Sequence, residues 1–278
     1  MESQKVPQNL KALGLIAGKG RYPALVVQEA RRSGVERVTM AAFEGETTLE
    51  VAELADEVVW MRVGQLGKLL KTLKEFGVKQ AMMAGQITPG RLFELRPDWQ
   101  ALKVLLSLKQ RNAETLFGAV ADAMERAGIE LLPAMTFLDE YVAGAGHLAG
   151  PRADRQLQWD LHTAWPVITQ LSALDVGQCV VVKKGTILAV EGYDGTNATI
   201  RRGGELGRGG ATLCKISKPN QDFRFDVPVI GLDTVKTCQE AGIQRIILES
   251  GKALILDKEE VFAFCKQHKI TLWGNGEK

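Results

Sequence analysis

The sequence predicts an α/β protein made of two α/β domains, and three observations lead to this prediction. Short apolar runs alternate with amphipathic helical segments through the first half of the chain. A stretch rich in glycine, alanine and proline, residues 142–158, then interrupts the pattern. Strand and helix signals resume after it. With 278 residues, of which 45% are hydrophobic, the chain can bury two modest cores.

Residues 1–141 are predicted to form a Rossmann-like domain with a parallel sheet. Strand signals lie at 12–17, 38–43, 57–61 and 80–85, and helix signals lie at 24–33, 66–76, 98–109 and 113–127. Pro23 suits the start of the first helix, and Gly77 suits the end of the second. This alternation places helices on both faces of a parallel sheet.

Residues 142–158 are predicted to be a connection, and residues 159–278 a second α/β domain with a mixed sheet. Its strand signals lie at 178–183, 186–191, 211–216, 245–249 and 270–273, and its helix signals at 159–171, 233–241 and 258–268. The first two strands flank Lys184-Gly185, which predicts an antiparallel pair.

The composition excludes several classes of function. Thirty-five basic and 33 acidic residues give a net charge of +2, which offers no electrostatic footprint for nucleic acid. The polar N-terminus and the absence of a long apolar run predict a cytoplasmic protein without a signal peptide or membrane span. The four cysteines form no C-x-x-C pair and are expected to be reduced packing residues. The three histidines lie outside polar clusters, which argues against a histidine-based catalytic triad or metal centre.

Two glycine turns follow strands of the first domain and should meet at the carboxyl edge of its sheet. Ligands of open α/β folds bind along that edge, where glycines admit a phosphate and helix N-termini attract it. A nucleotide or sugar-phosphate site and a plain tight turn both remain open. The candidate substrate-binding residues are Gly18, Lys19, Gly20, Arg21, Gly85, Gln86 and Thr88.

The segment 191–197 ends a predicted strand with two acids and a helix start. Glu191 and Asp194 could ligate Mg²⁺, which binds proteins through one or two carboxylates. Gly195, Thr196 and Asn197 could bind substrate, or the last two could cap the following helix. Arg201 and Arg202 could clamp a phosphate or be solvated.

The run from Lys215 to Pro228 is too charged for a protein core, because unpaired buried charges cost several kcal/mol each. We interpret it as a site loop in which cations hold an anionic substrate and carboxylates hold a metal or a water. If residues 222–226 are extended, alternate side chains share one face; an internal salt bridge on an edge strand is the alternative. The candidate catalytic residues are Lys215, Lys218, Gln221, Asp222, Arg224 and Asp226.

Taken together, these segments resemble the LpxI family, the UDP-2,3-diacylglucosamine pyrophosphatases of lipid A biosynthesis. The segments that carry the resemblance, which covers about residues 13–273, are Gly14-Leu15-Ile16-Ala17-Gly18-x-Gly20-x-x-Pro23, Met83-Ala84-Gly85, Leu174-Asp175-x-Gly177-Gln178, Ala189-Val190-Glu191-Gly192 and Lys218-Pro219-Asn220-Gln221-Asp222-x-Arg224-Phe225-Asp226-x-Pro228-x-x-Gly231.

The resemblance implies a hydrolase dependent on Mg²⁺, or Mn²⁺, that holds its substrate in a cleft between the two domains. Water would attack the α-phosphorus of UDP-2,3-diacylglucosamine, giving UMP and 2,3-diacylglucosamine 1-phosphate, known as lipid X. The family's essential aspartate maps to Asp222 or Asp226. Asp222 is favoured as a metal ligand, with help from Glu191 or Asp194. The amphiphilic substrate implies transient contact with the inner leaflet of a membrane, and a homodimer is left open.

The chain departs from the family pattern at two places. Gly195-Thr196-Asn197 stands where many members have Gly-Thr-Asp, and Arg111-Asn112-Ala113-Glu114 stands where many have paired aspartates. Two alternatives therefore stay open: a hydrolase of another nucleotide sugar, and a sugar-nucleotide-binding protein without catalysis.

Overall fold

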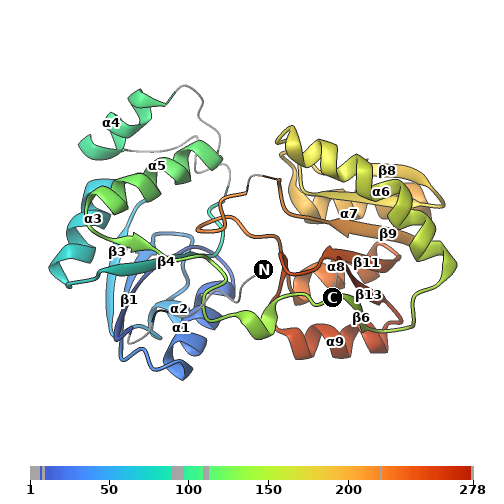
Figure 1. Cartoon of the computed structure of the whole chain (residues 1–278), viewed down its shortest axis with the longest axis horizontal. Coiled ribbons are helices and arrows are strands. Elements are labelled where there is room, and N and C mark those ends of the chain that lie inside the picture. Colours follow the sequence, from blue (N-terminus) through green and yellow to red (C-terminus); the bar gives the residue numbers. More distant parts are fainter. Residues whose placement is uncertain (1–6, 8–9, 89–96, 109–112, 220, 277–278) are drawn as a thin grey trace. The chain divides into compact units, whose positions relative to one another are not determined.

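A computed structural model describes residues 7, 10–88, 97–108, 113–219 and 221–276 of the chain (Figure 1). The chain divides into two compact units, each an α/β structure, which confirms the predicted fold class. The N-terminal unit contains Glu2–Asp139 together with the short segment Asp222–Asp226. The C-terminal unit contains Glu140–Gln221 and Val227–Lys278.

The N-terminal unit has a five-stranded parallel sheet with the order β3-β2-β1-β4-β5. The strands are β1 (Ala12–Ala17), β2 (Arg37–Phe43), β3 (Glu57–Met61), β4 (Gln80–Ala84) and β5 (Glu130–Leu131). The strand order reverses between β1 and β4, so this unit has the topological switch point of a Rossmann-type sheet. The carboxyl ends of β1 and β4 therefore lie side by side.

Helices cover this sheet as the sequence predicts (Figure 1). They are α1 (Tyr22–Arg32), α2 (Leu49–Ala52), α3 (Leu66–Glu75), α4 (Trp99–Ser107) and α5 (Ala113–Arg126). Ile16 and Met83 of the sheet pack with Leu73 of α3 and Met124 of α5 in one buried cluster. Phe225, which is distant in sequence, packs against the same cluster.

The C-terminal unit has a mixed six-stranded sheet with the order β6-β13-β11-β9-β7-β8. β9, β11 and β13 are parallel, whereas β6, β7 and β8 run antiparallel to their neighbours. The strands are β6 (Gly146–Ala149), β7 (Cys179–Lys183), β8 (Thr186–Val190), β9 (Ala211–Lys215), β11 (Ile243–Glu249) and β13 (Thr271–Asn275). A second, two-stranded parallel sheet joins β10 (Val229–Ile230) to β12 (Leu254–Ile255).

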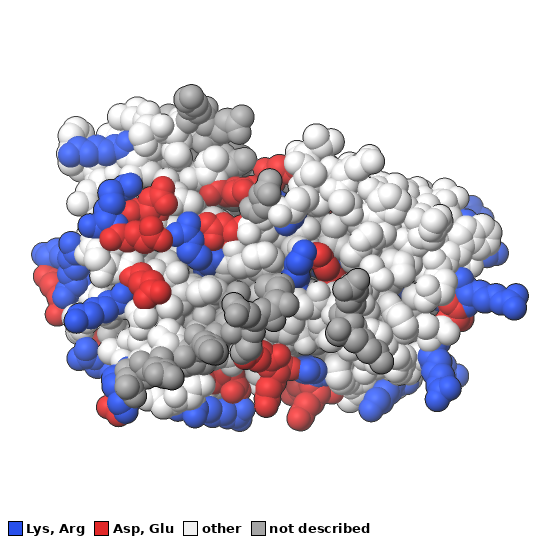
Figure 2. Space-filling view, in the orientation of Figure 1, with Lys and Arg blue, Asp and Glu red and all other residues white. Residues whose placement is uncertain are grey.

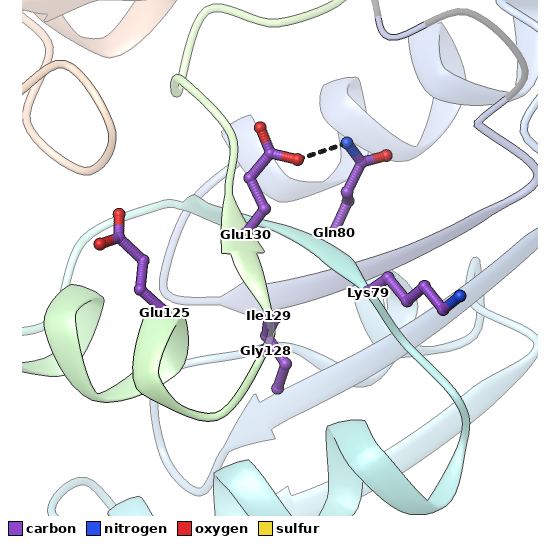
Figure 3. Close-up of a pocket in the computed structure, with 6 residues that line it drawn as sticks. All are labelled: Lys79, Gln80, Glu125, Gly128, Ile129 and Glu130. Atoms are coloured by element: carbon purple, nitrogen blue, oxygen red, sulfur yellow. Dashed lines mark hydrogen bonds between the residues drawn. The ribbon is translucent and has the colours of Figure 1, made fainter.

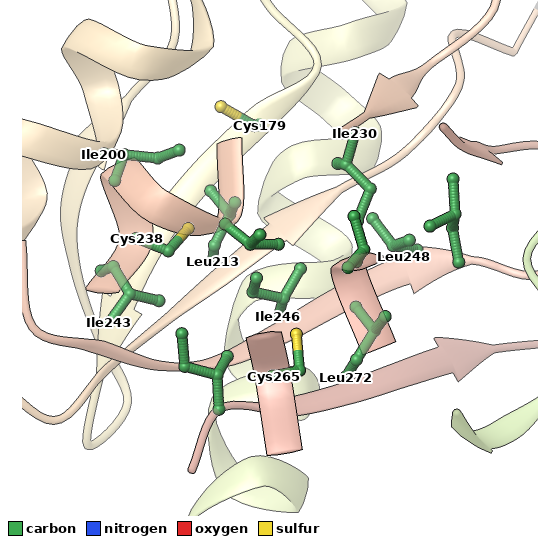
Figure 4. Packing of buried hydrophobic residues seen from close by; sticks show 14 of the residues in the cluster. Cys179, Ile200, Leu213, Ile230, Cys238, Ile243, Ile246, Leu248, Cys265 and Leu272 are labelled. Carbon is green, nitrogen blue, oxygen red and sulfur yellow. The ribbon is translucent and has the colours of Figure 1, made fainter. Parts of the chain in front are cut away.

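Successive side chains of a strand point to opposite faces of the sheet, so the core of this unit consists of two buried clusters. The helices are η2 (Asp139–Tyr141), α6 (Arg155–Ala173), α7 (Gly195–Gly207), α8 (Leu232–Glu240) and α9 (Lys258–Gln267). Val180 and Val182 of β7 pack with α6 residues, whereas Val181 belongs to the cluster with residues of α7, α8 and α9, part of which Figure 4 shows. All four cysteines are buried and free, in agreement with their predicted packing role. Burial raises the pKa of Cys265 to about 12.

The glycine-rich stretch 142–158 is part of the C-terminal unit. Its residues 146–149 form β6, which pairs with β13, and its last residues lead into α6. A Cβ at Gly150 would lie 1.8 Å from the Ile270 carbonyl oxygen, so this glycine permits close backbone packing. The glycine-rich composition, from which a connection between domains was predicted, thus reflects tight backbone packing at the edge of the C-terminal sheet.

Among the residues described, no helix is long and apolar enough to cross a membrane.

Candidate functional site

The two glycine turns of the N-terminal unit are joined to each other at the switch point. The backbone N–H of Gly18 donates to the Ala84 carbonyl at 2.8 Å. Lys19 and Gln86 exchange backbone hydrogen bonds of 2.7 and 3.1 Å, which form an isolated antiparallel bridge. The sequence-based expectation that both turns lie at the carboxyl edge of the sheet agrees with this geometry.

Close packing of these two turns explains why glycine occupies positions 18 and 85. A Cβ at Gly18 would lie 2.5 Å from the Gln86 carbonyl oxygen, and one at Gly85 would lie 2.7 Å from that of Lys19. The N–H groups of Gly18 and Lys19 donate to protein acceptors, so they are not spare donors for a phosphate. Gly20 and Arg21, just before α1, are exposed to solvent.

A buried acid at this edge escapes the sequence analysis. Glu46 follows β2, is 3% exposed, and accepts a 3.0 Å hydrogen bond from Thr88 Oγ1. Its neighbour Thr47 donates to the Ala17 carbonyl at 2.5 Å and accepts from Phe43 N–H at 2.9 Å. The sequence does contain a signal for Glu46 and Thr47: they are polar residues directly after a buried strand. Such residues lie at the edge of the sheet where ligands bind in open α/β folds.

Residues 222–226 form a turn, so the extended arrangement considered from the sequence is not adopted, whereas an internal salt bridge, the alternative, is present. The Asp222 carbonyl accepts from Phe225 N–H at 3.2 Å and from Asp226 N–H at 3.0 Å. The Arg224 side chain folds back on the Asp222 carboxylate, with Nε–Oδ1 at 3.0 Å and Nη2–Oδ2 at 2.7 Å. Hydrogen bonds from Arg224 lower the pKa of Asp222, although partial burial opposes them. Asp222 is therefore ionised at neutral pH.

This turn packs on the N-terminal unit. The Phe223 carbonyl accepts from Ala134 N–H at 2.7 Å, and the Phe225 ring lies 5.8 Å from the Phe117 ring. Arg224 Nη1 also donates to Glu125 of α5 at 2.7 Å. The predicted catalytic residues consequently separate into two groups. Asp222, Arg224 and Asp226 belong to the N-terminal unit, and Lys215, Lys218 and Gln221 belong to the C-terminal unit.

A buried acid, hydroxyl and lysine meet at the start of α7. Thr196 Oγ1 donates to Glu191 Oε1 at 2.6 Å and accepts from Lys215 Nζ at 2.8 Å. The second Glu191 oxygen accepts from the Gln178 N–H at 2.9 Å. Glu191 is 9% and Lys215 is 8% exposed, so the two opposite charges compensate each other in a dry setting.

The N-terminus of α7 adds positive potential to this group. Asp194 precedes the helix, but its side chain does not cap it. Instead, Arg202 Nη1 donates to Asp194 Oδ2 at 2.5 Å, and this hydrogen bond lowers the pKa of Asp194. The first N–H groups of a helix lack intrahelical acceptors, so Thr196 and Asn197 begin a helix end that favours anions.

Gln221 contributes a buried donor to the C-terminal unit. Its Oε1 accepts from the Lys218 N–H at 2.6 Å. Its Nε2 is buried and finds no hydrogen-bond partner in the part of the chain that the structure describes. The Lys218 side chain donates to Asp175. An unsatisfied buried donor costs about 1–3 kcal/mol, so this amide is suited to an acceptor that a ligand brings.

The carboxylates do not form a ready-made metal cage. No cluster of three or more His, Cys, Asp or Glu side chains suited to a metal occurs within the described ranges. Asp222 and Asp194 are paired with arginines, and both oxygens of Glu191 accept hydrogen bonds. Mg²⁺ commonly uses one or two carboxylates plus substrate phosphates. The donor set therefore fits a cation that arrives with a diphosphate, and it fits a dedicated protein site poorly.

A shallow depression of about 560 Å³ lies where β4 and β5 begin, at the amino edge of the N-terminal sheet (Figure 3). Gln80 Nε2 donates to Glu130 Oε2 there at 2.6 Å, and Glu125 stands beside them. None of the sequence-predicted site residues lines this depression. The predicted residues Arg111 and Asn112 lie outside the described residues.

Fold and site together define a two-domain α/β protein with a Rossmann-type N-terminal sheet and, in the other unit, a helix start that lies beside a buried lysine. The chain belongs to the LpxI family. The family's N-terminal domain matches residues 12–141, and its C-terminal domain matches residues 144–273. The resemblance drawn from the sequence motifs is thereby confirmed.

A curated relative covers nearly the same length. It is the UDP-2,3-diacylglucosamine pyrophosphatase LpxI of Caulobacter vibrioides, 32% identical over 266 residues, which are 91% of this chain and 94% of the relative. Among solved structures, the biotin carboxylase subunit of a pyruvate carboxylase is 14% identical, with a TM-score of 0.28 over 66% of this chain and 38% of its own. The biotin carboxylase domain of Hydrogenobacter thermophilus 2-oxoglutarate carboxylase is 13% identical, with a TM-score of 0.29 over 71% of this chain and 41% of its own. Such low TM-scores carry no argument about function.

Proposed function

We propose that the protein hydrolyses the diphosphate of UDP-2,3-diacylglucosamine and releases UMP and 2,3-diacylglucosamine 1-phosphate. The observation that carries this proposal is family membership over almost the whole chain, with a relative named for that pyrophosphatase at 32% identity. The candidate site supports it, because its donors are of the kind that hold phosphate oxygens.

In this proposal, the C-terminal unit holds the diphosphate. Lys215 has further N–H bonds beyond the one that it donates to Thr196, and Gln221 Nε2 offers another donor. The start of α7 supplies oriented backbone dipoles. These groups stabilise charge that develops on phosphoryl oxygens, and they are already in place before the reaction. Glu191 balances the charge of Lys215, and Thr196 fixes the direction of its ammonium group.

A divalent cation is the proposed cofactor, Mg²⁺ or alternatively Mn²⁺. The more accessible candidate carboxylates are Asp194 in the C-terminal unit, 38% exposed, and Asp222 in the N-terminal unit, 26% exposed, whereas Glu191 is nearly enclosed. Bound together with the diphosphate, such a cation would supply neutralisation of negative charge and would lower the pKa of a water bound to it. In the described structure Asp222 is held by Arg224, which keeps its carboxylate ionised and oriented.

The direct test is hydrolysis of UDP-2,3-diacylglucosamine in detergent micelles, with Mg²⁺, Mn²⁺ or EDTA, in ¹⁸O-enriched water. We expect turnover that EDTA abolishes, with the label in UMP, as attack on the α-phosphorus requires. Label in the 2,3-diacylglucosamine 1-phosphate would overturn that point of attack and leave the overall reaction standing. Equal turnover of a soluble UDP-sugar would indicate a hydrolase of another nucleotide sugar. Binding without turnover in either metal would indicate a non-catalytic sugar-nucleotide-binding protein.

A further inference from the structure

We infer that the outward face of α4, formed by Trp99, Leu102, Lys103 and Leu106, is the surface by which the N-terminal unit binds an anionic lipid bilayer. This inference rests on the proposed function, because a substrate with two acyl chains is held in a membrane.

α4 exposes large apolar side chains on one face. Trp99 is 69% exposed and Leu106 is 70% exposed, and they lie seven residues apart on the same side of the helix. Leu102 lies between them in helical spacing and is half-buried. The opposite side is the packed one, where Ala101 and Val104 contact the core of the unit. An apolar face directed away from the core marks an interaction surface when its residues are contiguous.

The helix is fixed firmly enough to present this face. Asp98 Oδ1 accepts from the Ala101 N–H at 2.9 Å, which caps α4. Its other oxygen accepts from the Gly67 N–H at 2.7 Å, which attaches α4 to the start of α3. The exposed side chains therefore stand on an anchored helix and have no route into the core of the unit.

The charge pattern around this face favours an anionic surface. Lys103 is exposed on the face itself, with its Nζ 5.3 Å from the centre of the Trp99 ring. Within the described residues 97–108 the sequence has one basic residue, Lys103, and one acidic residue, Asp98. Asp98 is engaged as the helix cap, which leaves Lys103 as the charge on this face. Figure 2 shows a mostly uncharged surface over α4 with a basic side chain at its left side, whereas acidic and basic atoms both lie over α5.

The neighbouring helix α3 provides a contrast within the same unit. Its exposed side carries Lys71 and Glu75, which are 74% and 60% exposed and form an ion pair of 3.7 Å. Such a face is suited to water. The face of α4 combines tryptophan, leucine and a lysine that can extend to the headgroups, which is the composition of helices that lie in a membrane interface.

A bilayer fits this face better than an enclosed lipid does. The face is one side of a single helix, and by itself such a face does not surround an acyl chain, whereas a flat lipid surface can receive it. Burial of the tryptophan and a leucine supplies apolar binding energy, and the lysine adds attraction to anionic headgroups.

The test is vesicle flotation of the full-length protein without substrate. Wild type should float with phosphatidylcholine vesicles that contain phosphatidylglycerol. The double variant Trp99→Gln/Leu106→Gln should show an about tenfold lower partition coefficient. The matched control is Trp159→Gln/Leu206→Gln, which removes the same residue types at positions that are 57% and 60% exposed, and it should float like wild type. Lys103→Gln should lower binding about fivefold on anionic vesicles and leave binding to neutral ones unchanged.

Equal flotation of wild type and Trp99→Gln/Leu106→Gln would overturn the inference. So would a wild-type dimer that the same variant converts to a monomer without loss of flotation, because the face would then bind a second copy. A separate assay distinguishes this inference from the proposed function. The variant should hydrolyse substrate in detergent micelles at the wild-type rate and be slower only on vesicles. If wild type floats through Trp99 but hydrolyses nothing, the proposed function fails while the lipid surface stands.

Discussion

Lys215 Nζ lies 2.8 Å from Thr196 Oγ1, and through that hydroxyl a buried lysine at the end of β9 is coupled to Glu191 at the end of β8. A direct ion pair would occupy the ammonium group with a carboxylate. The interposed hydroxyl balances the two charges and leaves N–H bonds of Lys215 directed elsewhere. Under the proposed function, these N–H bonds are the ones that would meet an anionic ligand.

The first prediction concerns this hydroxyl. Thr196→Val should lower kcat/KM about tenfold or more, because it removes a buried hydrogen bond from each of two charged groups. Thr196→Ser, which restores the hydroxyl, should recover most of the activity. The matched control is Thr199→Val, one turn along α7, where Oγ1 donates only to the Gly195 carbonyl at 3.0 Å. Equal losses of kcat/KM in Thr196→Val and Thr199→Val would show that the hydroxyl supports only the fold.

The second prediction separates binding from stability at Gln221. Gln221→Leu removes a buried donor that has no partner among the described residues, but it also removes the Oε1 that accepts from the Lys218 N–H, so the two effects oppose and the free energy of unfolding should change by no more than about 1 kcal/mol. Because the amide is proposed to meet a phosphate oxygen, kcat/KM should nevertheless fall about tenfold. Urea denaturation and steady-state kinetics on the same preparation measure both quantities. A destabilised variant with normal kinetics would contradict the proposed role.

The third prediction follows the ionisation of Asp222. Hydrogen bonds from Arg224 lower the pKa of Asp222 below its unfolded value, so the charged form stabilises the folded state. This stabilisation is present above the unfolded pKa of about 3.9 and is lost as the pH falls through the folded pKa. Asp222→Asn should therefore reduce the free energy of unfolding by about 1–3 kcal/mol at pH 7 and have little effect near pH 2.

The partner variant provides the control for this series. In an Arg224→Gln background, Asp222→Asn should have a clearly smaller effect at pH 7, because the ion pair is already absent and only the hydrogen bond from the backbone N–H of residue 224 remains. Urea denaturation curves from pH 2 to pH 7 measure the difference. A destabilisation that is independent of pH would point to turn geometry as its source.

The fourth prediction compares two helical glycines. A Cβ at Gly203 of α7 would lie 2.4 Å from the Val181 Cβ, so Gly203→Ala should lower the free energy of unfolding by about 1–3 kcal/mol. A Cβ at Gly118 of α5 meets nothing within 4 Å, so Gly118→Ala should raise it by about 1 kcal/mol. Thermal denaturation of both variants is sufficient. A stabilising Gly203→Ala would mean that α7 can move away from β7.

Local patterns predicted the elements of this protein well. The strand predicted at 57–61 coincides with β3, and those at 12–17 and 38–43 match β1 and β2 to within one residue. These runs are apolar because parallel strands are buried on both faces, so the signal lies in the strand itself. The two-residue strands β10 and β12 were not predicted, because so short a segment has no period of its own.

The sequence by itself determined the fold class, the family and the residue types of the site, because strand and helix periods and a long polar motif are local properties of the chain. Only the tertiary structure showed how the polar motif from Lys215 to Pro228 is divided between the two units. Asp222 to Asp226 form a turn on α5 of the N-terminal unit, whereas Lys215 and Gln221 stay with the C-terminal sheet. It also placed Thr196 between Lys215 and Glu191. Such pairings depend on which chain segments are adjacent in space. Contacts between charged residues that lie far apart in the sequence leave no periodic pattern in it, so they cannot be predicted from the sequence.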